Sequence, residues 1–320
     1  MSREPGTERP TRHLVGRPAR WTARRAARMV PAPLRTPSRP MSIEPAPLPT
    51  RGVEMDTEWA RRPVARATRR ALTETVWSGL VRYYADPEVT GADRLADLDP
   101  ESGAIFASNH FSHADTTLLL TVIPTPWRHR LFVAAAADYF FPNRVAGFAS
   151  ALGIGAVPIE RTRISKRSIE LPIELLRDGW SQIIYPEGGR SPDGWGQEFR
   201  PGVSLLAKAA GVPIVPTYLV GTDQVLQRGS NRPKRAPTKV VFGRPFRPGD
   251  DEDHRAVAAR LQAEVAALAD EVSSDWWSAR KKAARAESTD LAGPPVARWR
   301  RNWQLEERRR STSRPTWPKV

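Results

Sequence analysis

The 320-residue sequence contains no cysteine, which excludes disulfide bonds, thiolate metal sites and a cysteine nucleophile. Its net charge of +15 lies at the two ends, since residues 1–75 hold 16 arginines against 7 acidic residues and residues 276–320 hold 12 basic against 4 acidic residues. The 200 residues between them are close to neutral, which argues against a nucleic-acid-binding domain with its charge on the folded body.

Residues 1–63 are predicted to form a disordered, basic tail rich in proline and arginine. The tail has no apolar core of a secretory signal, and its eleven prolines would break the amphipathic helix that a transit peptide needs. No run of 18 apolar residues predicts a membrane-spanning helix.

Residues 64–275 are predicted to form a single α/β domain with a mixed, largely parallel sheet flanked by helices. Apolar residues at helical spacing predict an N-terminal helical segment over 64–86, as one helix or two. Further strands are expected at 103–108, 130–137, 154–160, 181–189, 212–221 and 238–246. Further helices are expected at 115–123, 167–179, 202–211 and 254–274, with an aromatic helical or irregular segment at 138–152. Gly179 and Gly211 are expected to end two of these helices.

The stretch VPIVPTYLVG at 212–221 carries two prolines around an apolar strand. Proline removes a backbone donor and limits pairing, so this strand is expected at a sheet edge or lining an apolar channel.

Residues 276–320 are predicted to form a basic C-terminal tail that contains five of the eleven tryptophans. Indole rings and basic side chains together are typical of a segment that lies on an anionic membrane surface. The alternatives are a helix that packs its tryptophans on the core, or disorder.

Two histidines and an aspartate interrupt the apolar sequence at SNHFSHAD, residues 108–115. One interpretation is structural, with Ser112 or Asp115 capping a helix that begins near Thr116. The other is catalytic: His110 follows a strand, where an open α/β sheet presents residues to a ligand, and Asp115 could hold one nitrogen of its ring. Such a pair can activate a hydroxyl group. His113 is interpreted as a supporting or surface residue.

Two arginines follow other predicted strands. In YPEGGRS the glycines Gly188 and Gly189 allow a sharp turn or a close backbone approach to a ligand, and Arg190 offers a planar fork suited to phosphate or carboxylate. In PIERTR, Arg161 stands just past the end of a strand in the same way. An ordinary glycine turn with a solvated arginine is the alternative interpretation.

Taken together and in this order, these blocks resemble the glycerolipid acyltransferase family, whose best-known members are 1-acylglycerol-3-phosphate acyltransferases. The resemblance covers roughly residues 76–250. NHFSHAD is similar to the first block of the family, NHxSxxD, at Asn109, His110, Ser112 and Asp115. GAVPIER resembles the second block through Arg161, and PEGGRS resembles the third block, PEGTRS, at Glu187, Gly188, Arg190 and Ser191. VPIVP resembles the fourth.

The resemblance implies that His110 is the general base, that Asp115 orients it, and that an acceptor hydroxyl attacks the thioester of acyl-CoA or acyl-carrier protein. It also implies a substrate-binding set made of Asn109, Ser112, Arg161, Glu187, Gly188 and Arg190. The acyl donor is then a substrate, and neither a cofactor nor a metal is expected. The expected partners are the donor, a lysophospholipid and a membrane surface, with the protein peripheral on the cytoplasmic face.

Two departures from the family pattern leave the acceptor open. Gly189 stands where the family usually has threonine, and Glu160 stands where it often has aspartate. A lysophospholipid, glycerol phosphate or another lipid hydroxyl or amine would fit. Two other functions remain as alternatives: a protein that binds nucleic acid or another anionic surface through its basic ends, and a membrane scaffold without activity.

Overall fold

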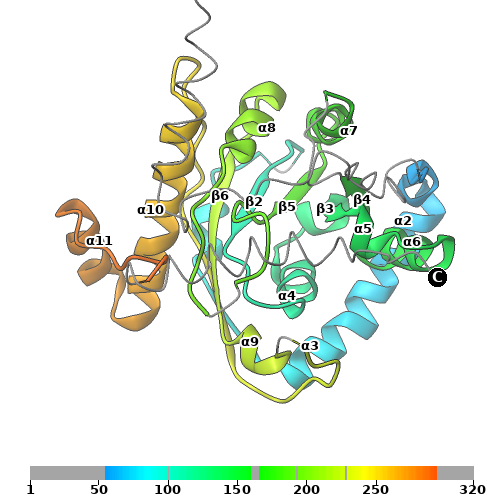
Figure 1. Cartoon of the computed structure of the whole chain (residues 1–320), viewed down its shortest axis with the longest axis horizontal. Helices are drawn as coiled ribbons and strands as arrows, with labels where there is room; N and C mark the ends of the chain where they lie inside the picture. Colours follow the sequence, from blue (N-terminus) through cyan, green and yellow to red (C-terminus); the bar gives the residue numbers. More distant parts are fainter. Residues whose placement is uncertain (1–54, 100, 160–165, 192–193, 228, 294–320) are drawn as a thin grey trace, which may run out of the picture. The chain divides into compact units, whose positions relative to one another are not determined.

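The computed structural model describes residues 55–293 except for 100, 160–165, 192–193 and 228, and the following account concerns these residues (Figure 1). By backbone contacts the chain divides into residues 1–47 and 48–320, and every element described here belongs to the second unit. The boundary proposed at residue 63 and the character of the N-terminal tail stay predictions.

Seven strands form one mixed sheet in the order β1-β7-β6-β2-β5-β3-β4 (Figure 1). They are β1 (Pro87–Thr90), β2 (Ile105–Ser108), β3 (Leu131–Ala136), β4 (Ala156–Ile159), β5 (Ser181–Ile184), β6 (Ile214–Val220) and β7 (Thr238–Phe242). Neighbouring strands are parallel except for β6 and β7, which are antiparallel. The predicted α/β class with a largely parallel sheet is therefore confirmed. β1 was not predicted.

Ten α-helices surround the sheet in the described part of the chain: α2 (Pro63–Leu72), α3 (Ser78–Tyr84), α4 (Ala114–Val122), α5 (Ala137–Phe140), α6 (Arg144–Ile154), α7 (Lys166–Arg177), α8 (Gly202–Ala210), α9 (Thr222–Val225), α10 (His254–Ser273) and α11 (Trp276–Ala284). Shorter helical turns are η2 (Glu58–Arg61), η4 (Ala92–Leu95) and η5 (Trp127–Arg130). None of these helices is both long enough and apolar enough to cross a bilayer.

The predicted N-terminal helical segment is one continuous helical run from α2 to α3. A π-helical stretch, η3 (Thr73–Trp77), joins the two, and the hydroxyl of Ser78 donates to the carbonyl of Thr73 within it. The wider π turn rotates the face of α3 relative to α2, so the two halves present different faces to the domain.

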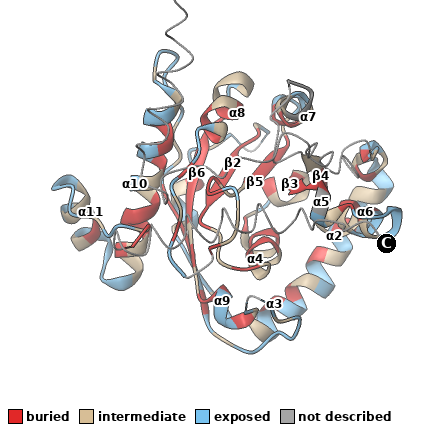
Figure 2. Cartoon of the chain, viewed as in Figure 1, coloured by how far each residue is buried: buried red, intermediate tan, exposed pale blue. Residues whose placement is uncertain are grey.

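Helices cover both faces of the sheet, and the buried residues lie between these layers (Figure 2). Consecutive residues of β2 alternate between the faces, as a strand requires: Phe106 joins the core with α3 and α4, whereas Ile105 and Ala107 join the core with α7, α8 and α10. A strand covered on both sides must be apolar throughout, which is why GAIFAS reads as a continuous apolar run.

The chain leaves β2 and β5, two neighbouring strands, toward opposite faces. From β2 it passes through α4 to β3, and from β5 it passes through α8 to β6, on the other side of β2 (Figure 1). Two diverging crossovers leave space just beyond the carboxyl ends of these strands, where open α/β sheets bind ligands. The topology therefore directs attention to the residues that follow Ser108 and Ile184.

Of the two places expected for residues 212–221, the sheet edge is wrong, and the lining of an apolar channel stays a prediction. β6 lies inside the sheet between β7 and β2. The sheet tolerates Pro216 because the β6–β7 ladder is interrupted there: it runs from Thr217↔Phe242 onward and resumes only at the bridge Ile214↔Phe246. Two residues of β6 thus face three residues, 243–245, of the segment after β7. Such a bulge is one of the few places where an interior strand accepts proline.

The described chain continues past the boundary predicted at residue 275. The helix α11 follows α10, with the carboxylate of Asp275 accepting from the backbone N–H groups of Trp277 and Ser278. Behind it, the buried carboxylate of Asp270 binds Lys282 and both the backbone N–H and the hydroxyl of Thr289. The first part of the predicted tail is therefore a helix attached to α10, but Trp276 and Trp277 are exposed and do not pack on the core as the helical alternative expected.

Candidate active site

The loop between β2 and α4 holds His110 and Asp115 at the carboxyl edge of the sheet. The Nδ1 atom of His110 lies 2.8 Å from Oδ2 of Asp115. The imidazole is 14% exposed and the carboxylate is fully buried. Because Asp115 engages Nδ1, Nε2 is the ring nitrogen that remains to meet a substrate.

Of the two capping residues considered in the structural interpretation, Asp115 does not cap its own helix, whereas the hydroxyl of Ser112 accepts from the N–H of Ala114 at the helix start. α4 begins at Ala114, and Asp115 lies in its first turn. Its Oδ2 atom accepts from the backbone N–H groups of Phe111 and Ser112 as well as from His110. Two fixed backbone donors hold the buried carboxylate in place, so its negative charge faces the imidazole in a defined geometry.

Asn109 and Ser112 fasten this loop to β6 and the segment after it. The side-chain amide of Asn109 donates to the carbonyl of Leu219 and accepts from its N–H, each at 2.8 Å. The hydroxyl of Ser112 donates to the carbonyl of Leu226 and accepts from the N–H of Ala114. Both side chains are 1% exposed. These contacts position the loop, and the substrate-binding role that the resemblance implies for Asn109 and Ser112 stays a prediction.

The turn after β5 fastens the loop from the other side. Oε1 of Glu187 accepts from the N–H of His110 at 2.9 Å, and the carbonyl of His110 accepts from the N–H of Ser191 at 2.8 Å. Oε2 of Glu187 accepts from the N–H of Gln197, and Glu187 is 1% exposed. The carboxylate of Glu187 thus holds the backbone of the general-base candidate, and its expected part in substrate binding stays a prediction.

Gly188 is exposed and has a φ of 72°, a left-handed conformation that favours glycine. A Cβ atom there would also lie 2.7 Å from the guanidinium carbon of Arg200, so any side chain would displace this arginine. Arg200 was missed in the sequence because it stands eleven residues beyond the PEGG block. Arg190 is half-buried at the end of the same turn. Arg161, the other arginine expected to bind an anion, lies outside the described residues.

Tyr185 is a second residue that the sequence did not identify. Its ring stacks on the imidazole of His110 with a centroid distance of 3.9 Å and an interplanar angle of 12°. Its hydroxyl lies 3.0 Å from the hydroxyl of Thr116 in α4. The one available signal was its place, directly after β5 and before the PEGG turn. His113, by contrast, stacks on Tyr139 at 5.0 Å, in keeping with its interpretation as a supporting residue.

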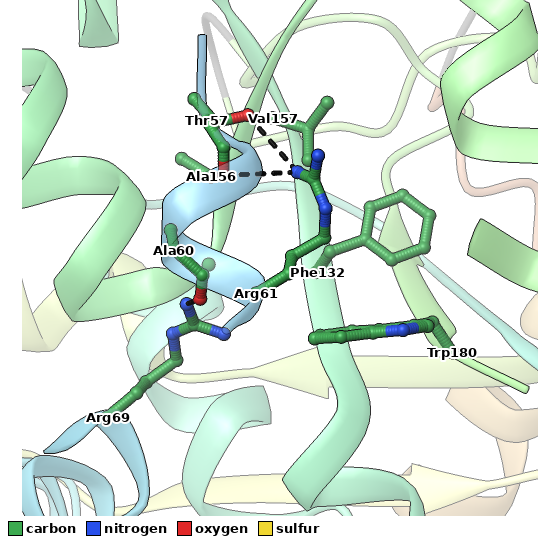
Figure 3. Close-up of a pocket in the computed structure, with 9 residues that line it drawn as sticks. Thr57, Ala60, Arg61, Arg69, Phe132, Ala156, Val157 and Trp180 are labelled. Carbon is green, nitrogen blue, oxygen red and sulfur yellow. Dashed lines mark hydrogen bonds between the residues drawn. The ribbon is translucent and has the colours of Figure 1, made fainter. Parts of the chain in front are cut away.

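The small cavity drawn in Figure 3, of about 10 Å³, is not this site. It lies at the opposite edge of the sheet, where β3, β4 and β5 begin. Its lining includes Arg61, Arg69, Phe132 and Trp180. It has room for about one water molecule.

Comparison with known proteins shows which proteins the region around the carboxyl-edge site is similar to. Residues 86–220, which span β1 to β6 and contain the whole site described above, match the family model described as Acyltransferase. The chain is 29% identical over 158 residues to the chloroplastic 1-acyl-sn-glycerol-3-phosphate acyltransferase BAT2 of Brassica napus, covering 48% of this chain and 43% of that protein. It is 26% identical over 173 residues to the 1-acyl-sn-glycerol-3-phosphate acyltransferase of Bacillus subtilis, covering 54% and 80%.

Among solved structures, the crystal structure of the 1-acyl-sn-glycerophosphate acyltransferase PlsC from Thermotoga maritima is similar, with a TM-score of 0.51 and 21% identity. The match covers 68% of this chain and 84% of that one, and at this identity it shows the fold. The chain spans less than half the length of the Brassica napus relative.

Proposed function

We propose that the chain is a glycerolipid acyltransferase, which transfers a fatty acyl group from acyl-CoA or acyl-carrier protein to the hydroxyl of a lysophospholipid such as 1-acyl-glycerol-3-phosphate. The observation that carries this proposal is the His110–Asp115 pair, placed at the carboxyl edge of the sheet between two diverging crossovers. The names of the relatives supply the acceptor, and the chemistry of the site agrees with it.

The proposed reaction needs one base and one leaving group. Nε2 of His110 removes the proton of the acceptor hydroxyl while the oxygen of that hydroxyl attacks the thioester carbon. The new C–O bond forms, the C–S bond breaks, and the imidazolium returns the proton to the departing thiolate. Asp115 stabilises the imidazolium between these two steps, because its buried charge lies 2.8 Å from the ring. Atoms and charge balance with no covalent enzyme intermediate and no cofactor.

The anionic group of the acceptor would bind at the turn after β5. Arg190 stands at the end of this turn, and we propose that it binds the phosphate together with Arg161. A lysophospholipid presents such a phosphate close to the free hydroxyl. Glycine at position 189 offers no side-chain donor there, so the arginines carry the recognition of the phosphate.

A lipid acceptor requires access to a membrane, and we propose peripheral association with its cytoplasmic face. Three exposed apolar side chains support this: Val76, Leu80 and Tyr83 are 47%, 43% and 55% exposed. Their spacing of four and three residues places them on one side of the η3–α3 helix. The exposed guanidinium of Arg235 lies over the ring of Tyr83, and an apolar face beside a basic residue suits an anionic lipid surface.

The experiment is an acceptor and donor screen with purified full-length protein. Labelled acyl-CoA, and separately acyl-carrier protein, is offered with lysophosphatidic acid, glycerol 3-phosphate and other lysophospholipids. We expect phosphatidic acid as the main product, with the His110→Ala variant as the inactive control. Failure of the wild-type protein to acylate any of these acceptors from either donor would refute the proposal.

A further inference from the structure

We propose that Tyr185 is a positioning residue for the reaction: its ring holds the imidazole of His110 in place and stabilises the imidazolium that forms during acyl transfer. This inference rests on the proposed function and deepens it. It comes from one geometric feature, the parallel stack of a phenol ring on the ring of the general-base candidate.

The imidazole of His110 is held by two contacts at right angles to each other. The hydrogen bond from Nδ1 to Asp115 lies in the ring plane and fixes the direction in which the ring points. The stack on Tyr185, at 3.9 Å and 12°, covers one ring face and fixes the orientation of the plane. Either contact alone would leave one rotation open. Together they fix the position of Nε2, and the accuracy of this position decides how well a proton is removed.

Tyr185 is itself anchored on two sides. Its backbone directly follows β5, and its hydroxyl lies 3.0 Å from the hydroxyl of Thr116, one residue after Asp115. The ring thus spans from the end of one strand to the first turn of the helix that carries Asp115. The stack, the carboxylate and the hydroxyl pair link β2, β5 and α4 around the imidazole.

The surroundings of Tyr185 favour the neutral form of its phenol. Burial raises the pKa of its phenol well above the ordinary value, and the charge of Asp115 raises it further. A neutral phenol keeps its hydroxyl proton for the pair with Thr116. Its ring also presents an electron-rich face, which attracts a cation. The stack is therefore stronger with imidazolium than with imidazole. Because the imidazolium forms during acyl transfer, this difference lowers the barrier of the reaction.

Three variants separate this role from plain packing. Tyr185→Phe keeps the ring and loses the hydroxyl, and Thr116→Val loses the other partner of the same contact, so both should keep kcat within about threefold. Tyr185→Leu keeps apolar bulk and loses the aromatic face, and its kcat should fall about 10-fold, with KM for donor and acceptor within about twofold. Phe242→Leu, the same truncation at a fully buried ring in β7, is the control: it should lower stability and leave kcat per folded molecule unchanged.

A second measurement does not depend on turnover. A ring stacked at 3.9 Å shifts the proton resonances of the facing imidazole upfield, so His110 should show this shift in the NMR spectrum of the wild-type protein. Its signals are assigned by their loss in His110→Ala. The upfield shift should persist in Tyr185→Phe and disappear in Tyr185→Leu.

Equal kcat values for Tyr185→Leu and Tyr185→Phe would overturn the inference, and so would an upfield shift that survives in Tyr185→Leu. A protein that acylates no acceptor defeats the proposed function, whereas the NMR comparison still decides whether Tyr185 holds His110.

Discussion

The two edges of the sheet both bury charged side chains, but they use them differently. At the carboxyl edge, Asp115 and Glu187 accept hydrogen bonds from the backbone and leave Nε2 of His110 open. At the amino edge, Arg69 donates to the carbonyls of Ala60, Ala151 and Leu152 (Figure 3 shows the first of these). The first set of bonds holds a reactive ring, and the second joins η2 and α2 to the end of α6.

The difference shows why burial of a charge does not by itself mark a functional site. Burial lowers the pKa of Arg69 to about 10, and the neighbouring charges of Arg66 and Arg61 contribute to the decrease. Such a shift is often used to find active sites. Here the guanidinium of Arg69 binds the carbonyls at the end of a helix, where a cation is favoured. The buried charge therefore has a structural explanation. The carboxyl edge differs because its buried charges converge on an atom that is accessible.

The largest effect is expected from Asp115→Asn. An amide in place of the carboxylate leaves the imidazolium without its counter-charge and offers an N–H group to backbone donors, so kcat should fall by about 10²-fold or more. Steady-state kinetics measure this, with Asp97→Asn on the exposed surface as a matched control. Retention of more than a tenth of the wild-type kcat would mean that Asp115 is only a structural residue like Arg69.

Arg69→Ala should affect stability instead of catalysis. It leaves three backbone carbonyls without their donor, at a cost of about 3 kcal/mol in the free energy of unfolding. Urea denaturation measures the loss, and kcat per folded molecule should match the wild type. The exposed neighbour Arg70→Ala should change stability by less than about 0.5 kcal/mol. A fall in kcat at unchanged folded fraction would break the distinction between the two edges.

A third buried charge, Asp270 in α10, extends the comparison to pH. Burial opposes its ionisation, but hydrogen bonds from Thr289 and Lys282 outweigh burial, so the pKa of Asp270 is lowered. A lowered folded-state pKa contributes stability that is fully present above the unfolded-state pKa of about 3.9 and is lost as the pH falls below it.

The wild-type protein should therefore be more stable than Asp270→Asn at pH 6, and the gap should narrow as the pH falls below about 4. Unfolding monitored by tryptophan fluorescence across this range measures the gap. A gap that stays constant with pH would show that the ionised carboxylate is not what holds Thr289.

The smallest effect is expected at Gln182, whose buried side-chain amide has no hydrogen-bonding partner in the described part of the chain. Gln182→Met removes the unpaired polar atoms at similar volume, so stability should stay unchanged or rise by up to about 1 kcal/mol. Gln262→Met is the contrasting variant, because Oε1 of Gln262 accepts from the N–H of Phe199, and it should lose about 1 kcal/mol. A larger loss at Gln182 than at Gln262 would contradict this assignment.

The sequence predicted the alternation of strands and helices because apolar periodicity persists wherever a strand is covered on both sides, as in β2. It failed at β1, which has four residues, three of them exposed, and pairs only with β7 at the edge of the sheet. It also failed for the position of β6. The bulge that accommodates Pro216 depends on the end of β7, at Phe242, which comes 26 residues later in the sequence.

Within the site, the sequence identified His110 and Asp115 and the hydrogen bond between them. It could not show that Asn109, Ser112 and Glu187 each bind a distant backbone group, since Leu219, Leu226 and His110 lie 77 to 114 residues away from them. It missed Tyr185 because an aromatic residue after a strand is usually part of the core. The contact that distinguishes Tyr185 is its stack on His110, which joins the end of β5 to the end of β2.

The most direct test of the whole account is the rate of acyl transfer to lysophosphatidic acid by wild type and by His110→Ala, with equal folded protein verified by circular dichroism. If His110 is the base, the variant should lose at least about 10²-fold in kcat/KM. If the variant works at a rate close to that of the wild type, the carboxyl-edge site is not where the proton is removed, and the proposed mechanism is wrong.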